Sequence, residues 1–267
     1  VGTKQAWAAA AALGKRALAS AGSTEAVART MAQARGQLGL NNLEGVQVKV
    51  LEGLIEKDML AYLRDVERNG APARSSEVRS RQEAKMHKSA AEALPQVYKQ
   101  VWKDVHLGRV LLAPRGERAL LTGVHSSPFG AVPKMNPDRS ISEEKRIVHD
   151  QQDVNASIPK EEHPPALQPR HRQLARLILW WRARCPLLQI LIAKRDISGA
   201  FRLIWLDPQD AELFAGDMPW KPEDMETCED GGNGLPEELP AVLEELMKDP
   251  EWADKACPEG VTSVLFS

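Results

Sequence analysis

Apolar residues in the first third of the chain recur at the three- and four-residue spacing that is typical of helices. Residues 6–19 are rich in alanine, the strongest helix former, and residues 25–38 follow a Ser-Thr start signal. The apolar positions within residues 48–63 predict the clearest amphipathic helix, which Gly70 would end.

A further helical stretch, rich in basic residues, is predicted from residue 76 to about residue 106, with a break at Pro95. No catalytic chemistry follows from these helices. We expect residues 1–110 to form a helical region that serves packing or protein interaction. The alternative is nucleic-acid binding through its basic side chains Arg74, Arg79, Arg81, Lys85 and Lys88.

The pattern changes to short β-type runs between residues 110 and 155, where Gly, Pro and Asn separate the runs. Runs near residues 129–134 and 145–150 flank the dipeptide Pro137-Asp138, which is typical of turns. This arrangement predicts an antiparallel β-hairpin.

A helix is predicted over residues 170–184, after a connector that contains three prolines. Its adjacent tryptophans, Trp180 and Trp181, are expected in a core, with stacking on nucleic-acid bases as the alternative. The buried face of the helix would carry Leu174, Leu177, Ile178 and Trp181.

Five apolar residues between positions 187 and 192 form a β-type run of the kind that a buried strand shows. Asp196 follows this run, so we expect it at the exit of the strand. Phe201 comes five positions later. Taken alone, an aspartate at such a place is typical of a turn or a helix cap.

Residues 221–260 are rich in Gly, Pro and acidic side chains, which predicts a surface insertion around a short helix near residues 240–247. A β-type run over residues 261–266 predicts a further strand.

Two further motifs stand before Asp196. Residues 127–134 read Ser-Pro-Phe-Gly-Ala-Val-Pro-Lys, and residues 145–155 read Lys-Arg-Ile-Val-His-Asp-Gln-Gln-Asp-Val-Asn. With Asp-Ile-Ser-Gly-Ala-Phe at 196–201, this ordered set resembles the fingers and front palm of reverse transcriptases, the RNA-directed DNA polymerases of retroviruses and retrotransposons. The resemblance covers about residues 120–220.

The resemblance implies an α+β fold in which a helical region precedes a partial fingers/palm (right-hand) polymerase domain, truncated before the family's Tyr-x-Asp-Asp motif. The expected units are the helical region over 1–110, the fingers and first half of the palm over 111–220, the acidic insertion over 221–260 and the start of a truncated palm segment over 261–267.

The implied reaction is template-directed nucleotidyl transfer from deoxynucleoside triphosphates onto a primer that is paired with an RNA or DNA template. Asp196 would hold Mg²⁺ or Mn²⁺ through its carboxylate, and Ile197 through its backbone carbonyl. Two such ions stabilise the attacking and leaving oxygens. The family's other metal ligands lie in the Tyr-x-Asp-Asp turn, and no Asp-Asp pair occurs in this sequence. We therefore expect the chain by itself to be inactive.

The resemblance also implies a nucleotide-binding set. Arg146 would hold the triphosphate as a planar fork and Lys134 as a point charge, with solvated surface charges as the alternative. Gly199 and Ala200 would offer backbone N–H groups to phosphate oxygens. Phe201 would pack under the sugar and exclude a 2′-hydroxyl group, with a core aromatic as the alternative.

The chain also departs from the family pattern. Gln152 stands where the family carries a second arginine, and His149 replaces an apolar residue. Asp150 is expected to be a structural carboxylate that pairs with arginine or with backbone donors. The acidic insertion would repel nucleic acid, so we expect it to point away from any cleft. A second class of function stays open: a non-catalytic helical interaction protein that carries a decayed polymerase segment.

The formal net charge of −2 hides an uneven distribution, because residues 164–195 contain no acidic side chain. A nucleic-acid partner is therefore compatible with the composition. The three widely spaced cysteines fit neither a disulfide framework nor a zinc site, which favours an intracellular protein of the cytoplasm or nucleus. Arginines interrupt the apolar stretch from 174 to 192, so no membrane span is expected. No leader is visible before a chain that begins with Val, and we expect a fragment, with its oligomeric state open.

Overall fold

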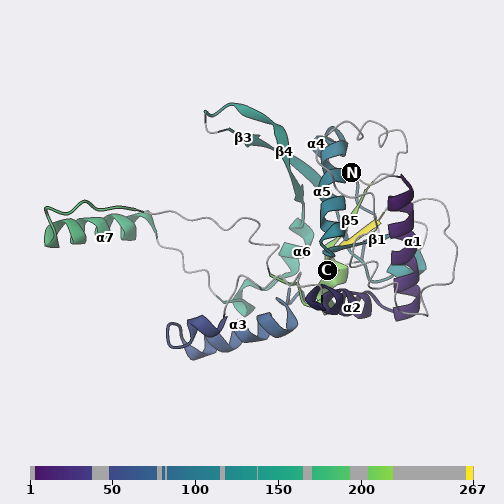
Figure 1. Ribbon diagram of the computed structural model, residues 1–267, viewed down its shortest axis with the longest axis horizontal. Coiled ribbons are helices and arrows are strands. Elements are labelled where there is room, and N and C mark those ends of the chain that lie inside the picture. Colours follow the sequence, from purple (N-terminus) through teal and green to yellow (C-terminus); the bar gives the residue numbers. More distant parts are fainter. Residues whose placement is uncertain are drawn as a thin grey trace.

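The computed structural model describes most of the chain, and most of its helices precede its strands (Figure 1), as in an α+β fold. The described residues are 4–37, 48–76, 80–81, 83–114, 118–136, 138–164, 170–192, 204–218 and 263–266. The two N-terminal helices predicted from the sequence are confirmed as α1 (Lys4–Ala21) and α2 (Thr24–Gln37). The acidic insertion and the helix predicted near 240–247 lie outside the described residues.

The amphipathic helix begins later than predicted. A short 3-10 helix, η1 (Val48–Leu51), precedes it, and α3 (Lys57–Asn69) starts only after a turn. Gly53 in that turn has a φ of 77°, a conformation that a helix cannot continue. Gly70 ends α3 as predicted, and its N–H donates to the Val66 carbonyl.

The prediction of one helical stretch from residue 76 is wrong in its first part, because the described residues between 76 and 87 are not helical. Arg81 instead forms an isolated parallel β-bridge with His125, so the backbone here bonds to another segment and not within a helix. Two helices follow, α4 (Lys88–Ala91) and α5 (Leu94–His106). The predicted break at Pro95 is confirmed, because α4 ends at Ala91 and Pro95 lies in the first turn of α5, where its missing N–H costs nothing.

Four short strands form a mixed sheet in the order β1-β6-β5-β2. They are β1 (Val110–Ala113), β2 (Ser126–Ser127), β5 (Ala215–Asp217) and β6 (Ser263–Phe266). β6 is antiparallel to both β1 and β5, whereas β5 and β2 are parallel. The strand predicted at residues 261–266 is thus confirmed over its last four residues.

The predicted hairpin is confirmed as β3 (Phe129–Met135) and β4 (Ile141–His149), which pair antiparallel and protrude from the body of the protein (Figure 1). The short elements η2 (Arg118–Leu121), α6 (Gln152–Ser157), η3 (Lys160–Glu162) and η5 (Pro208–Phe214) connect the larger ones.

The helix predicted over residues 170–184 is confirmed as α7 (His171–Arg184), but the burial of its apolar face is not. Most of the side chains expected in a core are exposed, at 41% for Leu174, 52% for Leu177, 45% for Trp181 and 47% for Trp180. Ile178 is partly buried. Figure 1 shows the reason, because α7 stands away from the sheets and from the other helices. An amphipathic pattern predicts a helix but not the surface that covers it.

The prediction of a buried strand at residues 187–192 is wrong. These residues form turns and irregular structure, and Leu187 and Leu191 are 97% and 80% exposed. A β-type run becomes a strand only where another strand accepts its backbone hydrogen bonds, and the described sheets offer this run no partner. Asp196, which follows, lies outside the described residues.

The core joins the N-terminal helices to the strands. Trp7 of α1 packs on Trp102 and Tyr98 of α5, with ring centroids 4.8 Å and 5.9 Å away, and all three side chains are fully buried. The same cluster includes residues of α2, β1, β3 and β5. The domain limits drawn from the sequence stay a prediction.

Gly14 of α1 sets how closely this helix approaches β1. A Cβ atom at this position would lie 1.8 Å from the Leu112 carbonyl oxygen. Gly14→Ala improves helix propensity, yet we expect it to lower the free energy of unfolding by about 2 kcal/mol, since the backbone must move apart. Urea denaturation measures this change. Ser20→Ala, on the exposed end of the same helix, is the matched control, and a stabilised Gly14→Ala protein would contradict the close approach.

Candidate functional site

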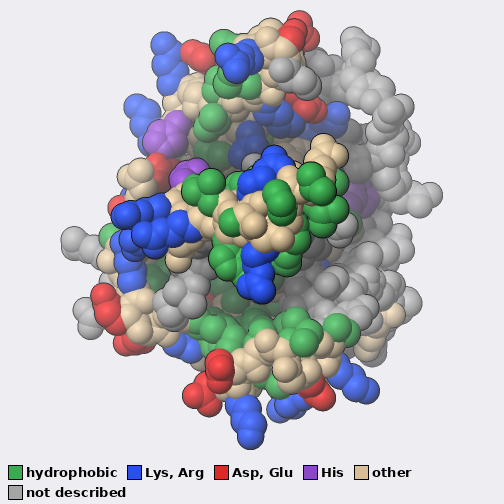
Figure 2. All heavy atoms as spheres, turned by 90° about the vertical axis from the view of Figure 1, so that its left-hand side faces the viewer, with side chains coloured by type: hydrophobic (Ala, Val, Ile, Leu, Met, Phe, Trp, Pro, Cys, Tyr) green, Lys and Arg blue, Asp and Glu red, His purple; other side chains and the backbone are tan. Residues whose placement is uncertain are grey.

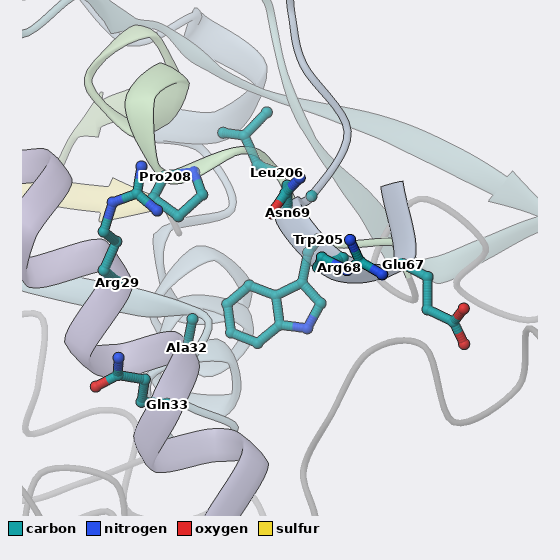
Figure 3. A pocket seen from close by; sticks show the side chains of 10 residues that line it. Arg29, Ala32, Gln33, Glu67, Arg68, Asn69, Trp205, Leu206 and Pro208 are labelled. Carbon is teal, nitrogen blue, oxygen red and sulfur yellow. The ribbon is translucent and has the colours of Figure 1, made fainter. Parts of the chain in front are cut away.

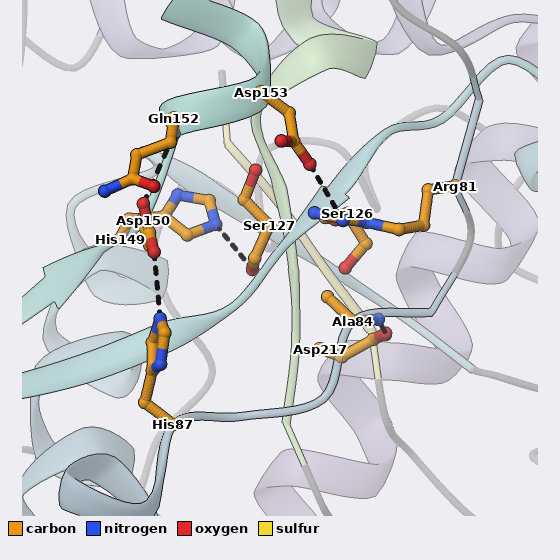
Figure 4. Close-up of polar contacts among 10 residues, drawn as sticks. All are labelled: Arg81, Ala84, His87, Ser126, Ser127, His149, Asp150, Gln152, Asp153 and Asp217. Atoms are coloured by element: carbon orange, nitrogen blue, oxygen red, sulfur yellow. Dashed lines mark hydrogen bonds and ion pairs between the residues drawn. The ribbon is translucent and has the colours of Figure 1, made fainter.

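The hairpin is anchored at its base by His149, the last residue of β4. The His149 ring stacks on Phe129, with centroids 4.9 Å apart and planes 20° from parallel. Its Nε2 lies 3.0 Å from the backbone oxygen of Ser127 in β2 and can donate to it (Figure 4). The four-stranded sheet therefore holds the hairpin directly.

Burial lowers the pKa of His149 from 6.5 to about 4. His125 acts in the same direction, whereas hydrogen bonds to backbone oxygens and the charge of Asp150 oppose it. The imidazole is therefore neutral in the folded protein at physiological pH. A neutral ring suits both its stacking on Phe129 and its donation of a hydrogen bond from Nε2 to a backbone oxygen.

Asp150 closes the base of the hairpin from the other side. Its N–H donates to the Pro128 oxygen over 2.9 Å, and Oδ1 accepts from the Gln152 N–H over 3.3 Å. Oδ2 lies 2.9 Å from His87 Nε2. The expectation of a structural carboxylate with backbone donors is confirmed, and its side-chain partner is a histidine rather than an arginine.

The described residues between 80 and 87 run beside the strands and are tied to them (Figure 4). Arg81 forms an ion pair of 2.8 Å with Asp153 of α6, and its Nε donates to the Ser126 oxygen over 2.8 Å. Asp217 accepts from the Ala84 N–H over 2.6 Å. Arg81, a nucleic-acid candidate by sequence, thus serves to hold this segment in place.

The outward face of the hairpin carries both cations that the sequence singled out. Arg146 lies opposite Val132, and Lys134 follows Val132 by two residues, so the two side chains share a face. Phe129 and Ala131, on the alternate face, are buried. Arg146 is exposed and Lys134 is partly exposed, so both can reach a ligand from solvent.

Lys134 has a partner on this face. Its Nζ lies 2.6 Å from Oε2 of Glu144, and this ion pair lowers the pKa of Glu144. Glu144 precedes Arg146 by two residues, so the face reads Lys134, Glu144, Arg146. Glu144 was not among the residues predicted from the sequence. A turn centred on Pro137-Asp138 would place residue 141 opposite Lys134, and only the observed register, with its irregularity between Pro133 and Met135, brings Glu144 to that position. A polyanion can bind to the two cations if it displaces the Glu144 carboxylate from Lys134.

The other residues that the sequence predicted for the site lie outside the described part of the chain. They are Asp196, Ile197, Gly199, Ala200 and Phe201. Within the part that is described, no group of three or more His, Cys, Asp or Glu side chains could hold a metal ion. The structure therefore brings Lys134 and Arg146 together and does not test the metal site.

A separate cavity of about 260 Å³ lies between α2, α3 and the segment before η5 (Figure 3). Trp205 lies in its wall, and the guanidinium of Arg35 sits 4.0 Å from the centre of the indole. Burial, followed by the charge of Arg109, lowers the pKa of Arg35 to about 10. None of the residues that the sequence predicted for the metal or nucleotide site is among those that line this cavity. Its wall consists of Arg29, Ala32, Gln33, Glu67, Arg68, Asn69, Gly70, Trp205, Leu206 and Pro208.

Comparison with known proteins gives no relative. No family model matches the chain, and neither a curated protein nor a solved structure does. The resemblance to reverse transcriptases therefore rests on the three motifs. None of the described helices has both the length and the apolar character that crossing a membrane requires.

The depressed pKa of His149 predicts a loss of stability in mild acid. The unfolded chain takes up this proton near pH 6.5 and the folded protein only near pH 4, so the stabilisation is complete above about pH 6.5 and declines as the pH falls toward 4. Between pH 7 and pH 5, protonation linked to His149 should lower the free energy of unfolding by about 2 kcal/mol.

His149→Phe keeps the stacking but cannot be protonated, so its unfolding free energy should fall about 2 kcal/mol less over that interval than the wild type's. Urea titrations at both pH values measure the difference. His171→Phe, on the exposed helix α7, is the matched control. Equal pH dependence in the wild type and His149→Phe would show that His149 is not buried in its neutral form.

Proposed function

We propose that the chain carries the fingers and the front half of the palm of a reverse transcriptase, an RNA-directed DNA polymerase, and that it does not polymerise by itself. The observation that carries this proposal is the shared outward face of Lys134 and Arg146 on one anchored hairpin. The motif order in the sequence connects this hairpin to the Asp196 segment.

The hairpin has the properties that triphosphate binding needs. Its base is held by the His149 and Asp150 contacts, so the outer strands present their side chains from a defined position. The planar Arg146 guanidinium can donate two parallel hydrogen bonds to phosphate oxygens, and Lys134 adds a mobile positive charge. A deoxynucleoside triphosphate is the polyanion that this class of polymerase consumes.

The metal site of the proposal depends on residues that the structure does not describe. Asp196 and the Ile197 carbonyl would hold Mg²⁺, which when bound neutralises phosphate charge in the transition state. Among the described residues, no cluster of three or more His, Cys, Asp or Glu side chains could hold a metal ion. The sequence contains no Asp-Asp pair, so this chain would bind the triphosphate without carrying out the chemical step by itself.

The remaining parts of the proposal follow from the resemblance. Gly199 and Ala200 would contact phosphate oxygens, and Phe201 would lie under the sugar. The partners would be a primer and an RNA or DNA template, which places such an enzyme in the cytoplasm or the nucleus. Mn²⁺ could replace Mg²⁺ because both accept oxygen ligands.

Lys134→Ala and Arg146→Ala should each weaken triphosphate binding about tenfold, because each removes a charge-assisted contact. Isothermal titration with a deoxynucleoside triphosphate in Mg²⁺ measures this. Lys145→Ala is the matched control, because Lys145 neighbours Arg146 on β4 and alternation places it on the other face. Its effect should stay below about twofold.

Asp196→Ala should remove the part of the affinity that depends on Mg²⁺, which titration in the presence of a chelator defines. Binding that is insensitive to Lys134, Arg146 and Asp196 would make the two cations ordinary solvated charges. The chain would then fit the other class, a helical interaction protein with a decayed polymerase segment.

Glu144→Gln should raise triphosphate affinity by about threefold, because the carboxylate that pairs with Lys134 competes with phosphate for the same ammonium group. The same titration tests this prediction. Glu143→Gln, at the neighbouring position of β4, controls for the change in net charge. An equal gain in both variants would point to general electrostatic repulsion instead of release of Lys134.

A further inference from the structure

The cavity between α2, α3 and the segment before η5 has walls that are joined by the backbone itself (Figure 3). The Ala71 N–H donates to the Trp205 oxygen over 2.6 Å, and the Ala71 oxygen accepts from the Asp207 N–H over 3.0 Å. Gly70, with a φ of 94°, lets the end of α3 lie against this segment, because a Cβ atom there would come within 2.6 Å of the Leu206 oxygen. The α3 wall and the Trp205 wall therefore keep a fixed spacing.

The α2 wall is fixed near both of its ends. At the start of the helix, the Thr24 hydroxyl donates to the Glu212 carboxylate of η5 over 3.5 Å. Near its end, the Arg35 guanidinium lies 4.0 Å from the centre of the Trp205 ring, and both of these side chains are buried. The cavity is thus formed by contacts within the protein, as is usual for binding sites of small molecules.

The charged groups of the wall favour an anion. In Figure 3 the guanidiniums of Arg29 and Arg68 lie on either side of Trp205, whereas the Glu67 carboxylate points away from it. Among the described residues, the Arg68 side chain forms no hydrogen bond or ion pair. Arg29 uses Nε and one terminal nitrogen on Glu25 and keeps the other terminal nitrogen. Phosphate and carboxylate oxygens are the acceptors that match such guanidinium donors.

The same cavity contains apolar surface from Trp205, Leu206 and Pro208, with Ala32 opposite on α2. A bare inorganic ion would leave this surface in contact with water, so an occupant with an apolar part gains more from binding. The volume of about 260 Å³ lies just below the range of about 300–1,000 Å³ that drug-sized ligands occupy. The cavity therefore suits a small molecule.

The surface around the cavity does not select anions by its overall charge. Helix α3 carries three basic and three acidic side chains. Figure 2, which looks at the side from which α3 and α7 project, shows acidic and basic side chains together along the lower part of this face. A preference for anions must therefore come from the groups of the cavity wall.

We propose that this cavity is a binding site for a small organic oxyanion, which is a phosphate or a carboxylate attached to an apolar group. Arg68 and Arg29 hold the oxyanion, and the apolar group packs between Trp205 and Ala32. The site shares no residue with the hairpin face of Lys134 and Arg146. The proposal is therefore independent of the polymerase function, and either can fail without the other.

NMR titration of the full chain, labelled with nitrogen-15, tests the site through the indole N–H signal of Trp205. Trp205→Phe identifies this signal by its loss. Phenyl phosphate and benzoate are the probes, and the tighter of the two shows which oxyanion the site prefers. This probe should shift the signal with a dissociation constant of about 1 mM or less. Inorganic phosphate, which lacks the apolar group, and phenol, which lacks the charge, should bind at least about tenfold more weakly. The indole signals of Trp7 and Trp102 in the core should stay in place.

Arg68→Gln should weaken binding of the tighter probe about tenfold, because it removes a charge-assisted contact. Arg64→Gln is the matched control, because Arg64 lies one turn earlier on α3, pairs with Glu52 and is not part of the wall. Its effect should stay below about twofold. Ala32→Leu should also weaken binding at least about tenfold, because the larger side chain fills the space of the apolar group.

Four outcomes would overturn the proposal. The Trp205 signal could stay unchanged up to about 10 mM of either probe. Inorganic phosphate could bind as tightly as the probes, which would indicate an adventitious ion only. Phenol could bind as tightly as they do, which would remove the role of the oxyanion. Equal effects of Arg68→Gln and Arg64→Gln would assign the binding to general surface charge.

Discussion

The stacking of His149 on Phe129 is the contact on which the rest of the candidate site depends. It joins the first residue of β3 to the last residue of β4, and the hydrogen bond from His149 to Ser127 connects both to the four-stranded sheet. A two-stranded hairpin by itself is marginally stable in water, and here the His149 contacts add to the hydrogen bonds that tie the hairpin to Ser89 and Gln96. Because its base is held, the outward face has a defined direction, and Lys134 and Arg146 lie at defined positions on it.

In the core, the packing depends on how closely the backbone of α1 approaches β1. Gly14 lets α1 lie against β1, and this brings Trp7 onto Trp102. The alanine-rich composition of α1 therefore has a structural meaning beyond helix propensity, because small side chains allow a helix to approach a strand closely. A helix that reads as a separate interaction module in sequence contributes to the core shared with the strands.

Local patterns predicted the elements whose partners are near in sequence. The hairpin, α1 and α2 depend on turn signals and helix propensity, and all three were found where expected. The predictions were wrong where strand pairing or burial depends on residues that are distant in sequence. The run at 187–192 has the composition of a strand but pairs with none, and the apolar side of α7 is uncovered. At the site, sequence patterns placed Lys134 and Arg146 on one hairpin, whereas the pairing of Lys134 with Glu144 required the register.

β6 shows how far apart in sequence the decisive contacts lie. Its residues 263–266 lie between β1, which ends at Ala113, and β5, so one of the two inner strands of the sheet comes from a segment about 150 residues downstream of β1. Closing such a long loop costs conformational entropy before any ladder forms. The native partner of this edge of β1 thus comes from the last strand of the described chain, so the sheet that supports the hairpin depends on a contact between distant parts of the sequence.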